Sequence, residues 1–294
     1  MKHAWLIIAH NNFEILEKLL KYFDHECNNI YLHLDKKVKC YKVPENICKK
    51  ANLCVVPNPV NVMWGGSSQI ECEMKLLEIA LKDKNDYYHL ISGVDVPLQK
   101  FSALENFFQI HKGKEFVRFV DGEIDPKLYL DRVGVHHYFQ NFIGKRDKFI
   151  AKVLNKFQNM IIKLELIFGI DRNKKNNFLL SYGPNWFSIT DDFAKYVVSQ
   201  KKFISKRFKF SFCADEIFLQ TLMVNSTFKN KNYSIENKEN QILRHIDWDR
   251  GNPYTFGLED YELLKKLPKE FFFARKFDYQ KSPEIVEKLF KDVL

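Results

Sequence analysis

The chain has 294 residues and 46% hydrophobic residues, which suits one large α/β domain or two small ones and excludes a disordered protein. Its net charge of +9 fits a solubilising surface or an anionic partner, but no zinc-finger spacing or arginine-rich arm indicates nucleic-acid binding. The six cysteines form no Cys-x-x-Cys pair and no run of 18 apolar residues occurs. We therefore expect reduced thiols in a cytoplasmic protein without a membrane-spanning helix.

The first 35 residues predict a strand, a helix and a second strand. Apolar residues run continuously over 4–9, as in a buried parallel strand, and an amphipathic pattern over 13–23 predicts a helix that Asn12 is placed to cap. The second strand, 30–35, ends on Asp35. Ligands bind beyond the carboxyl ends of strands in such sheets, so His10 and Asp35 are candidate ligand contacts. The alternative for Asp35 is a turn aspartate before two lysines.

A tryptophan and two glycines precede the next predicted helix. The segment Trp64-Gly-Gly-Ser-Ser68 lies between a short strand at 55–56 and a helix over 69–81. The glycines allow the backbone to approach a ligand closely, and the indole of Trp64 is suited to stacking on a base or flanking a sugar. No Lys-Ser/Thr follows the glycines, so the segment is not a P-loop.

Two further strands end in carboxylates. The strand 87–91 is followed by Ser-Gly-Val-Asp95, and the strand 116–120 is followed by Asp121. In a doubly wound sheet these side chains meet at the edge that also carries Asp35. The segment 92–98 contains no Asp-x-Asp, the usual metal bridge to a sugar-nucleotide diphosphate.

Residues 140–177 differ in composition from the rest. Basic residues alternate with apolar ones at helical spacing over 145–168. One explanation is a surface helix whose apolar face packs on the core. The other is an amphipathic helix that lies on an anionic membrane.

The segment 208–224 contains the clearest candidate for catalysis. A turn and a short strand at 181–190 and an Asp-capped helix at 193–199 precede it, and an aromatic, strand-like run over 208–212 leads into Asp215 and Glu216. An apolar helical pattern begins at 217. Carboxylates in a first helical turn are usually solvated caps. The alternative is that Glu216 is a general base at the floor of a cleft.

The C-terminal part contains basic residues that are candidate contacts for an anionic ligand. A weakly alternating segment at 241–248 ends in Asp-Trp-Asp followed by Arg250, and helices are predicted over 259–267 and 283–293. Between these helices, Arg275 and Lys276 lie among phenylalanines. A partly buried cation needs an anionic partner, and both side chains suit phosphate oxygens.

Eight segments, in this order, resemble the core-2/I-branching β-1,6-N-acetylglucosaminyltransferase family, glycosyltransferase family 14, which also holds the peptide O-xylosyltransferases. They are Ile-Ala-His-Asn at 8–11, His-Leu-Asp-Lys-Lys at 33–37, Trp-Gly-Gly-Ser-Ser at 64–68, Leu-Ile-Ser-Gly-Val-Asp-Val-Pro-Leu at 90–98, Tyr-Gly-Pro-Asn-Trp-Phe at 182–187, Ala-Asp-Glu-Ile-Phe-Leu-Gln-Thr at 214–221, His-Ile-Asp-Trp at 245–248 and Phe-Phe-Ala-Arg-Lys-Phe-Asp at 272–278. The resemblance implies a GT-A-type α/β fold with a Rossmann-like mixed sheet flanked by helices. It implies one domain over 1–294, with a nucleotide-sugar-binding half at 1–125 and an acceptor and catalytic half at 126–294.

The resemblance also assigns site residues. It makes Glu216 the catalytic base and implies a UDP-sugar donor with no metal or other cofactor. On the donor side it places Asp35, Trp64, Asp95, Arg250, Arg275 and Lys276, with Arg275 and Lys276 on the diphosphate and Arg250 near the position of a second diphosphate cation. On the acceptor side it places Asn185, Trp186 and Asp215.

The implied activity is inverting transfer of a sugar, GlcNAc in most of the family, to a glycan hydroxyl. The membrane anchor and lumenal disulfides of animal members are not visible here, and the composition looks bacterial. We therefore expect an acceptor in surface polysaccharide or lipopolysaccharide, free or lipid-linked, and an enzyme peripheral at the inner membrane through 145–168. The alternatives are xylosyl or hexosyl transfer by the same fold, or a non-catalytic glycan- or membrane-binding module. A nucleotidyltransferase would need metal-binding carboxylates.

Overall fold

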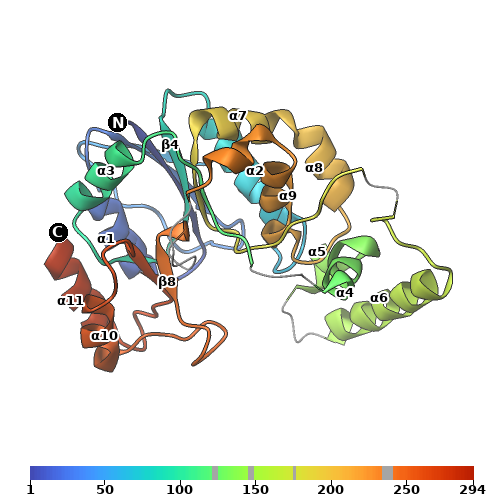
Figure 1. The fold of residues 1–294 in the computed structure, drawn as a ribbon. Coiled ribbons are helices and arrows are strands. Elements are labelled where there is room, and N and C mark those ends of the chain that lie inside the picture. The colour runs from blue at the N-terminus through green and yellow to red at the C-terminus, as the bar shows by residue number, and fades with distance from the viewer. Residues whose placement is uncertain (121–124, 145–148, 175–176, 234–240) are drawn as a thin grey trace.

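The computed structural model describes residues 1–120, 125–144, 149–174, 177–233 and 241–294. Asp121 and the first residues of the basic segment, 145–148, lie outside these ranges. The described residues form a mixed sheet with helices on both faces and a smaller second sheet beside it (Figure 1). The predicted α/β class with a Rossmann-like mixed sheet is confirmed, and the arrangement is consistent with a GT-A-type fold.

The larger sheet has six strands. In spatial order they are β3 (Asn52–Val55), β2 (Asn28–Leu34), β1 (His3–Ala9), β4 (Tyr87–Ser92), β7 (Phe187–Thr190) and β6 (Phe116–Val117). β7 pairs antiparallel with both of its neighbours, while β1 pairs parallel with β2 and β4. Because β7 comes from the second half of the chain and lies between strands of the first, the two expected halves share one sheet.

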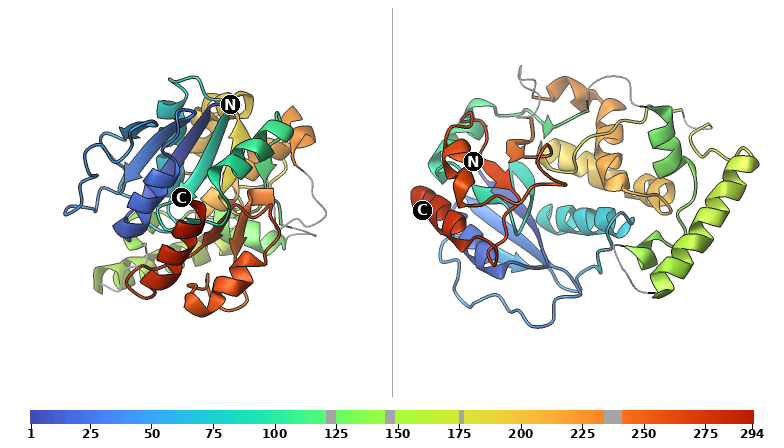
Figure 2. Two further views of the ribbon diagram at one scale, coloured as in Figure 1. Left: turned by 90° about the vertical axis from the view of Figure 1, so that its left-hand side faces the viewer. Right: turned by 90° about the horizontal axis from the view of Figure 1, so that it is seen from below.

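Alternating side chains of β1 serve two hydrophobic cores. Trp5 and Ile7 face the first core, and Ala4 and Leu6 face the second. The first core is covered by α1 (Phe13–Tyr22), α3 (Phe101–Ile110) and α11 (Pro283–Val293). The second is covered by α2 (Ser68–Ala80), α7 (Asp191–Ser199), α8 (Lys201–Phe208) and α9 (Phe218–Val224), as Figures 1 and 2 show.

The smaller sheet attaches the C-terminal segment to the end of β4. Its order is β5 (Val96–Pro97), β9 (Phe273–Arg275) and β8 (Arg244–Ile246), with β9 antiparallel to β5 and parallel to β8. Three residues separate β5 from β4, so this pairing brings Arg275 to the carboxyl edge of the larger sheet. A 3-10 turn (Leu258–Asp260) and α10 (Tyr261–Lys265) connect β8 to β9.

A group of helices stands at the end of the molecule away from α11 (Figure 1). It consists of α4 (Pro126–Tyr129), a π-helical turn (Leu130–Gly134), α5 (Gln140–Ile143) and α6 (Phe149–Ile167). Two 3-10 turns, Ala214–Glu216 and Thr227–Lys231, flank α9. Within the described ranges, no helix combines the length and the apolar character needed to cross a bilayer.

Three local predictions are wrong. Asn12 precedes α1 but does not cap it, because its side chain accepts a hydrogen bond from the backbone of Tyr279 at 2.9 Å. The cap of α7 is Thr190, whose hydroxyl accepts from the N–H of Phe193 at 3.4 Å. The aromatic run over 208–212 is not a strand, since α8 continues to Phe208. The aromatic residues lie at a helix end and in the loop after it, where an alternating pattern of apolar residues does not indicate a strand.

Candidate active site

A cavity of about 640 Å³ opens at the carboxyl ends of β1, β2 and β4. The chain leaves β1 towards β2 on one side, and β4 lies on the other, so this is the switch point where open α/β sheets bind ligands. Seven of the ten predicted site residues line the cavity: Asp35, Trp64, Asn185, Trp186, Asp215, Glu216 and Arg275. Asp95, Arg250 and Lys276 do not.

Glu216 is held by an arginine from a distant segment. Arg132, in the π-helical turn, brings Nη1 to 2.5 Å from Oε2 of Glu216, and its guanidinium lies 4.9 Å from the ring centre of Tyr182. The Glu216 side chain is 32% exposed, so it stays accessible from the cavity. The hydrogen bond and charge of Glu216 raise the pKa of Arg132, although burial alone would lower it. Sequence reasoning missed Arg132.

The loop beside Glu216 is fixed by a glycine. The N–H of Gly183 donates to the backbone carbonyl of Glu216 at 2.9 Å. A Cβ at Gly183 would lie 2.1 Å from the carbonyl oxygen of Arg118, so a side chain cannot fit there. Asp215 and Glu216 both lie in the first turn of the 3-10 helix, where free backbone N–H groups favour acidic residues, and neither the 3-10 helix nor α9 has a side-chain cap from its N-cap residue.

Two further carboxyl groups lie near Glu216, and one of them, Asp215, also lines the cavity. Burial, followed by the charge of Glu216, raises the pKa of Asp215 to about 7. Glu73 of α2 is completely buried, and burial together with the charge of Asp215 holds its pKa well above the usual value. The side-chain amide of Gln69 lies 3.1 Å from Oε1 of Glu73 and opposes this rise of the Glu73 pKa in part. The side-chain amide of Asn185 acts in the same direction. The site thus has one accessible carboxyl with an arginine partner and two that favour their neutral forms.

We expect Glu73→Gln to stabilise the protein increasingly as pH rises. Folded Glu73 keeps a proton that the unfolded chain releases above pH 4.5, so the free energy of unfolding falls as pH rises towards the folded pKa. Glutamine does not titrate and therefore removes this fall of the unfolding free energy, which amounts to at most about 1.4 kcal/mol per pH unit. Urea unfolding at pH 4, 6 and 8 measures it, with the exposed Glu71→Gln as control. Parallel pH profiles for wild type and Glu73→Gln would contradict the expectation.

Asp35 organises the loop that follows β2. Its carboxylate accepts hydrogen bonds from the backbone N–H groups of Lys37 at 2.9 Å and Val62 at 3.2 Å, and it pairs with the Lys37 ammonium at 3.1 Å. Its side chain is almost completely buried but borders the cavity. His10 lies beside it, and burial lowers the pKa of His10 while the charge of Asp35 opposes the shift. A turn role and a ligand contact are therefore compatible for Asp35.

Two exposed tryptophans line the cavity. The side chains of Trp64 and Trp248 are 50% and 55% exposed, respectively, although indoles are usually well covered. Such faces suit a base or a sugar ring. Trp248 was not among the predicted site residues, although the His-Ile-Asp-Trp segment contains it.

The glycine pair after Trp64 serves packing within the protein. Gly65 has a φ of 70°, and a Cβ there would lie 2.6 Å from the ring of Phe212. A Cβ at Gly66 would lie 2.2 Å from Oδ1 of Asn141. The expected close approach of this backbone to a ligand is not what the structure shows, because protein side chains occupy the space.

Arg275 reaches the cavity from a buried charge network. Asp95 is completely buried, pairs with Arg244 at 3.0 Å and lies 3.7 Å from Nε of Arg275. Both guanidinium groups stack on Trp186, at 4.6 and 4.4 Å from its ring. Burial lowers the pKa of Arg244 to about 10, and Asp95 opposes this. In this arrangement Asp95 positions the arginines from behind the cavity wall, and sequence reasoning missed Arg244.

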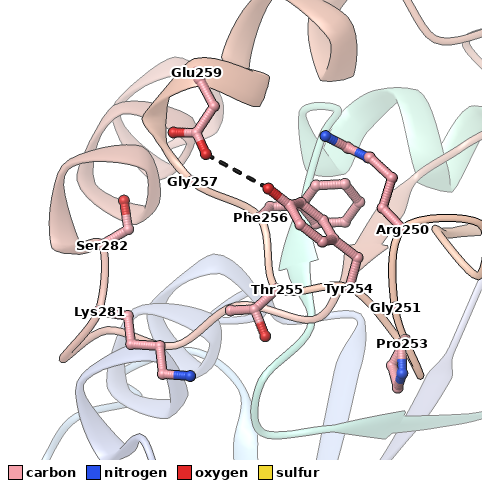
Figure 3. A pocket seen from close by; sticks show the side chains of 10 residues that line it. All are labelled: Arg250, Gly251, Pro253, Tyr254, Thr255, Phe256, Gly257, Glu259, Lys281 and Ser282. Carbon is pink, nitrogen blue, oxygen red and sulfur yellow. Dashed lines mark hydrogen bonds between the residues drawn. The ribbon is translucent and has the colours of Figure 1, made fainter.

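Arg250 lies in a neighbouring pocket of about 500 Å³ (Figure 3). It pairs with Asp247 at 2.6 Å and Asp260 at 2.7 Å, and its guanidinium lies 4.0 Å from the ring centre of Tyr254. Pro253 borders both this pocket and the larger cavity. Lys276 is half-buried and borders neither. The diphosphate roles of Arg250 and Lys276 remain predictions.

One Asp-x-Asp spacing does occur in the chain, at Asp247-Trp248-Asp249. In the structure, Oδ1 of Asp247 accepts hydrogen bonds at 3.0 Å from the N–H groups of Asp249 and Arg250, and Oδ2 pairs with Arg250. Among the residues with described positions, no three His, Cys, Asp or Glu side chains converge as ligands for a metal ion.

Comparison with known proteins gives consistent matches. A family model described as Core-2/I-Branching enzyme matches residues 3–267. Xylosyltransferase 2 of Canis lupus familiaris is 22% identical over 97% of this chain and 33% of its own length. Xylosyltransferase sqv-6 of Caenorhabditis briggsae is 24% identical over 87% of this chain and 32% of its own length. The chain thus spans about a third of the length of these curated relatives.

Proposed function

Because the chain belongs to the Core-2/I-Branching enzyme family, we propose that it is an inverting, metal-independent glycosyltransferase that moves a sugar from a UDP-sugar to a glycan hydroxyl. The observation that carries this proposal is the single cavity that holds Glu216 and Arg275 together at the carboxyl edge of the sheet. It offers an accessible carboxylate for a hydroxyl proton and a cation for a leaving phosphate.

The proposed reaction is a single displacement. The acceptor oxygen forms a bond to the anomeric carbon, Glu216 takes the hydroxyl proton, and the bond from that carbon to the UDP oxygen breaks. The leaving UDP keeps the electron pair, and Arg275 stabilises its added negative charge. Arg132 orients the Glu216 carboxylate without entering the reaction. Inversion follows because the acceptor attacks opposite to the departing UDP.

We propose GlcNAc as the donor sugar, with xylose as the alternative that the names of the similar proteins support. Hexoses remain further candidates. The exposed indoles of Trp64 and Trp248 suit sugar faces, since apolar C–H groups pack well on aromatic rings. For the acceptor we propose a bacterial surface polysaccharide or lipopolysaccharide precursor, free or linked to a lipid.

The first test is UDP release from a panel of UDP-sugars in the presence of EDTA. We expect slow hydrolysis of one donor without acceptor, at a rate that EDTA does not change. Activity that appears only with Mn²⁺ would contradict the metal-independent mechanism. Absence of both hydrolysis and UDP binding would favour a non-catalytic binding module, whereas UDP binding without hydrolysis would call for acceptor-dependent assays.

A further inference from the structure

The long helix α6 buries two polar side chains and leaves most of its large apolar side chains exposed. Its buried residues are Ala151, Gln158 and Glu165, which lie seven positions apart and therefore on one side. The side chain of Gln158 accepts from the N–H of Phe139 at 3.0 Å, and Glu165 contacts Nδ1 of His136 at 2.8 Å. These polar contacts, together with the buried Ala151, hold α6 to the body. Leu154, Ile161 and Ile162 are half-buried, so the explanation that the apolar face packs on the core holds only for this part of the helix, and most of its large apolar side chains stay exposed.

The opposite side of α6 is an exposed apolar stripe. At roughly 100° per residue, its members fall within an arc of about 100° that is centred well away from the buried side. The ends of the stripe are the most open, with Phe149 81% and Ile167 76% exposed. The stripe consists of Phe149, Ile150, Val153, Phe157, Met160, Leu164 and Ile167, and Phe168 continues it. An exposed apolar surface of this extent in one place marks an interaction site.

Lysines border the stripe along one edge. Lys152, Lys156 and Lys163 are all exposed, and at helical spacing they fall just beside the apolar arc. Glu165 is the one acidic residue of α6, and it faces the body against His136. The free side of α6 is therefore apolar and cationic without a compensating carboxylate. This combination complements a surface with an apolar interior and anionic headgroups.

We propose that α6 lies in the headgroup layer of an anionic lipid bilayer, with the apolar stripe inserted and the lysines on lipid phosphates. In Figure 1 and in the right-hand view of Figure 2, α6 forms the outer edge of the molecule, at the end away from α11, so a flat surface can reach it. The membrane contact is proposed independently of the proposed function. The further step, that this contact holds the protein next to a lipid-linked acceptor, rests on the proposed function.

The experiment is vesicle flotation with the full chain. The vesicles contain phosphatidylcholine alone or phosphatidylcholine with about 30% phosphatidylglycerol. We expect binding to the anionic vesicles, weaker binding at high salt and at most weak binding to the neutral ones. The triple substitution Ile150→Gln, Phe157→Gln and Ile167→Gln is expected to lower the partition coefficient at least about tenfold, and Lys156→Gln with Lys163→Gln to lower it for anionic vesicles.

The matched control replaces exposed apolar residues elsewhere, Ile110→Gln with Leu263→Gln, and should bind as wild type. Light scattering on the same proteins without vesicles reports self-association. Equal binding by the triple variant and wild type, absence of binding by both, or a dimer that only the triple variant loses would overturn the proposal. UDP release by the triple variant without vesicles should equal that of wild type. Failure of the membrane contact and failure of the transferase assignment are therefore distinguishable.

Discussion

Replacing Glu216 by Gln is expected to lower turnover by about 10²–10⁴-fold, the usual contribution of a positioned general base. Glutamine has nearly the same shape but cannot take the hydroxyl proton. UDP affinity should change less than about threefold, because Glu216 acts at the acceptor hydroxyl and Arg275 contacts the diphosphate in the proposed reaction. Measurement of kcat with saturating donor, together with calorimetric titration of UDP, separates the two effects.

The neighbouring Asp215 gives the matched comparison. Asp215→Asn removes a carboxyl group from the same turn, but among the described residues the ion pair of Arg132 is with Glu216. We expect it to lower turnover less than tenfold. A larger loss with Asp215→Asn than with Glu216→Gln would move the role of base to Asp215. Near-wild-type turnover of Glu216→Gln would remove Glu216 from the mechanism.

The largest expected effect on stability comes from Asp95→Asn, at about 3–5 kcal/mol of unfolding free energy. The substitution removes the counter-charge of Arg244, which is buried together with it, and of Arg275 behind the cavity. It also places an amide where the carboxylate accepts hydrogen bonds from Ser92 at 2.9 and 3.1 Å. Urea unfolding at pH 7 measures the loss, and UDP affinity should fall as Arg275 loses its support.

An exposed ion pair provides the control for this prediction. Glu78→Gln breaks the pair with Lys201, whose side chain is 59% exposed, and should cost less than about 1 kcal/mol. If Asp95→Asn is not recovered folded, the double substitution with Arg244→Met should regain part of the stability, because it removes the cation left unpaired. A loss below about 1 kcal/mol for Asp95→Asn alone would show that water or another group already compensates the arginines.

The sequence predicted the sheet and most helices because their signals are local. Continuous apolar runs such as 4–9 fit strands buried on both faces, and α11 has the predicted bounds, 283–293. The failures share a cause as well. Phe208, Phe210 and Phe212 alternate like a strand, but tertiary contacts place them at a helix end and in a loop. The predicted cap at Asn12 is wrong for a similar reason, because its side chain bonds to the backbone of Tyr279, 267 residues away.

In the candidate site, carboxylates next to strand ends could be predicted, but their partners could not. Arg132 reaches Glu216 across 84 residues, and no motif marks an arginine within a π-helical turn. Arg244 and Glu73 look in the sequence like an ordinary strand cation and an ordinary helix-surface acid. Only burial shows that one compensates Asp95 and that the other favours its neutral form.

The position of β7 has a consequence for synthesis on the ribosome. β4 has an unpaired edge until β7 emerges, and roughly 100 residues separate the two strands in the chain. At about 5–20 residues per second, this edge stays open for roughly 5–20 s after β4 has left the exit tunnel. Open strand edges pair readily with other chains, so a nascent chain paused before residue 187 exposes an aggregation-prone edge that the finished protein covers.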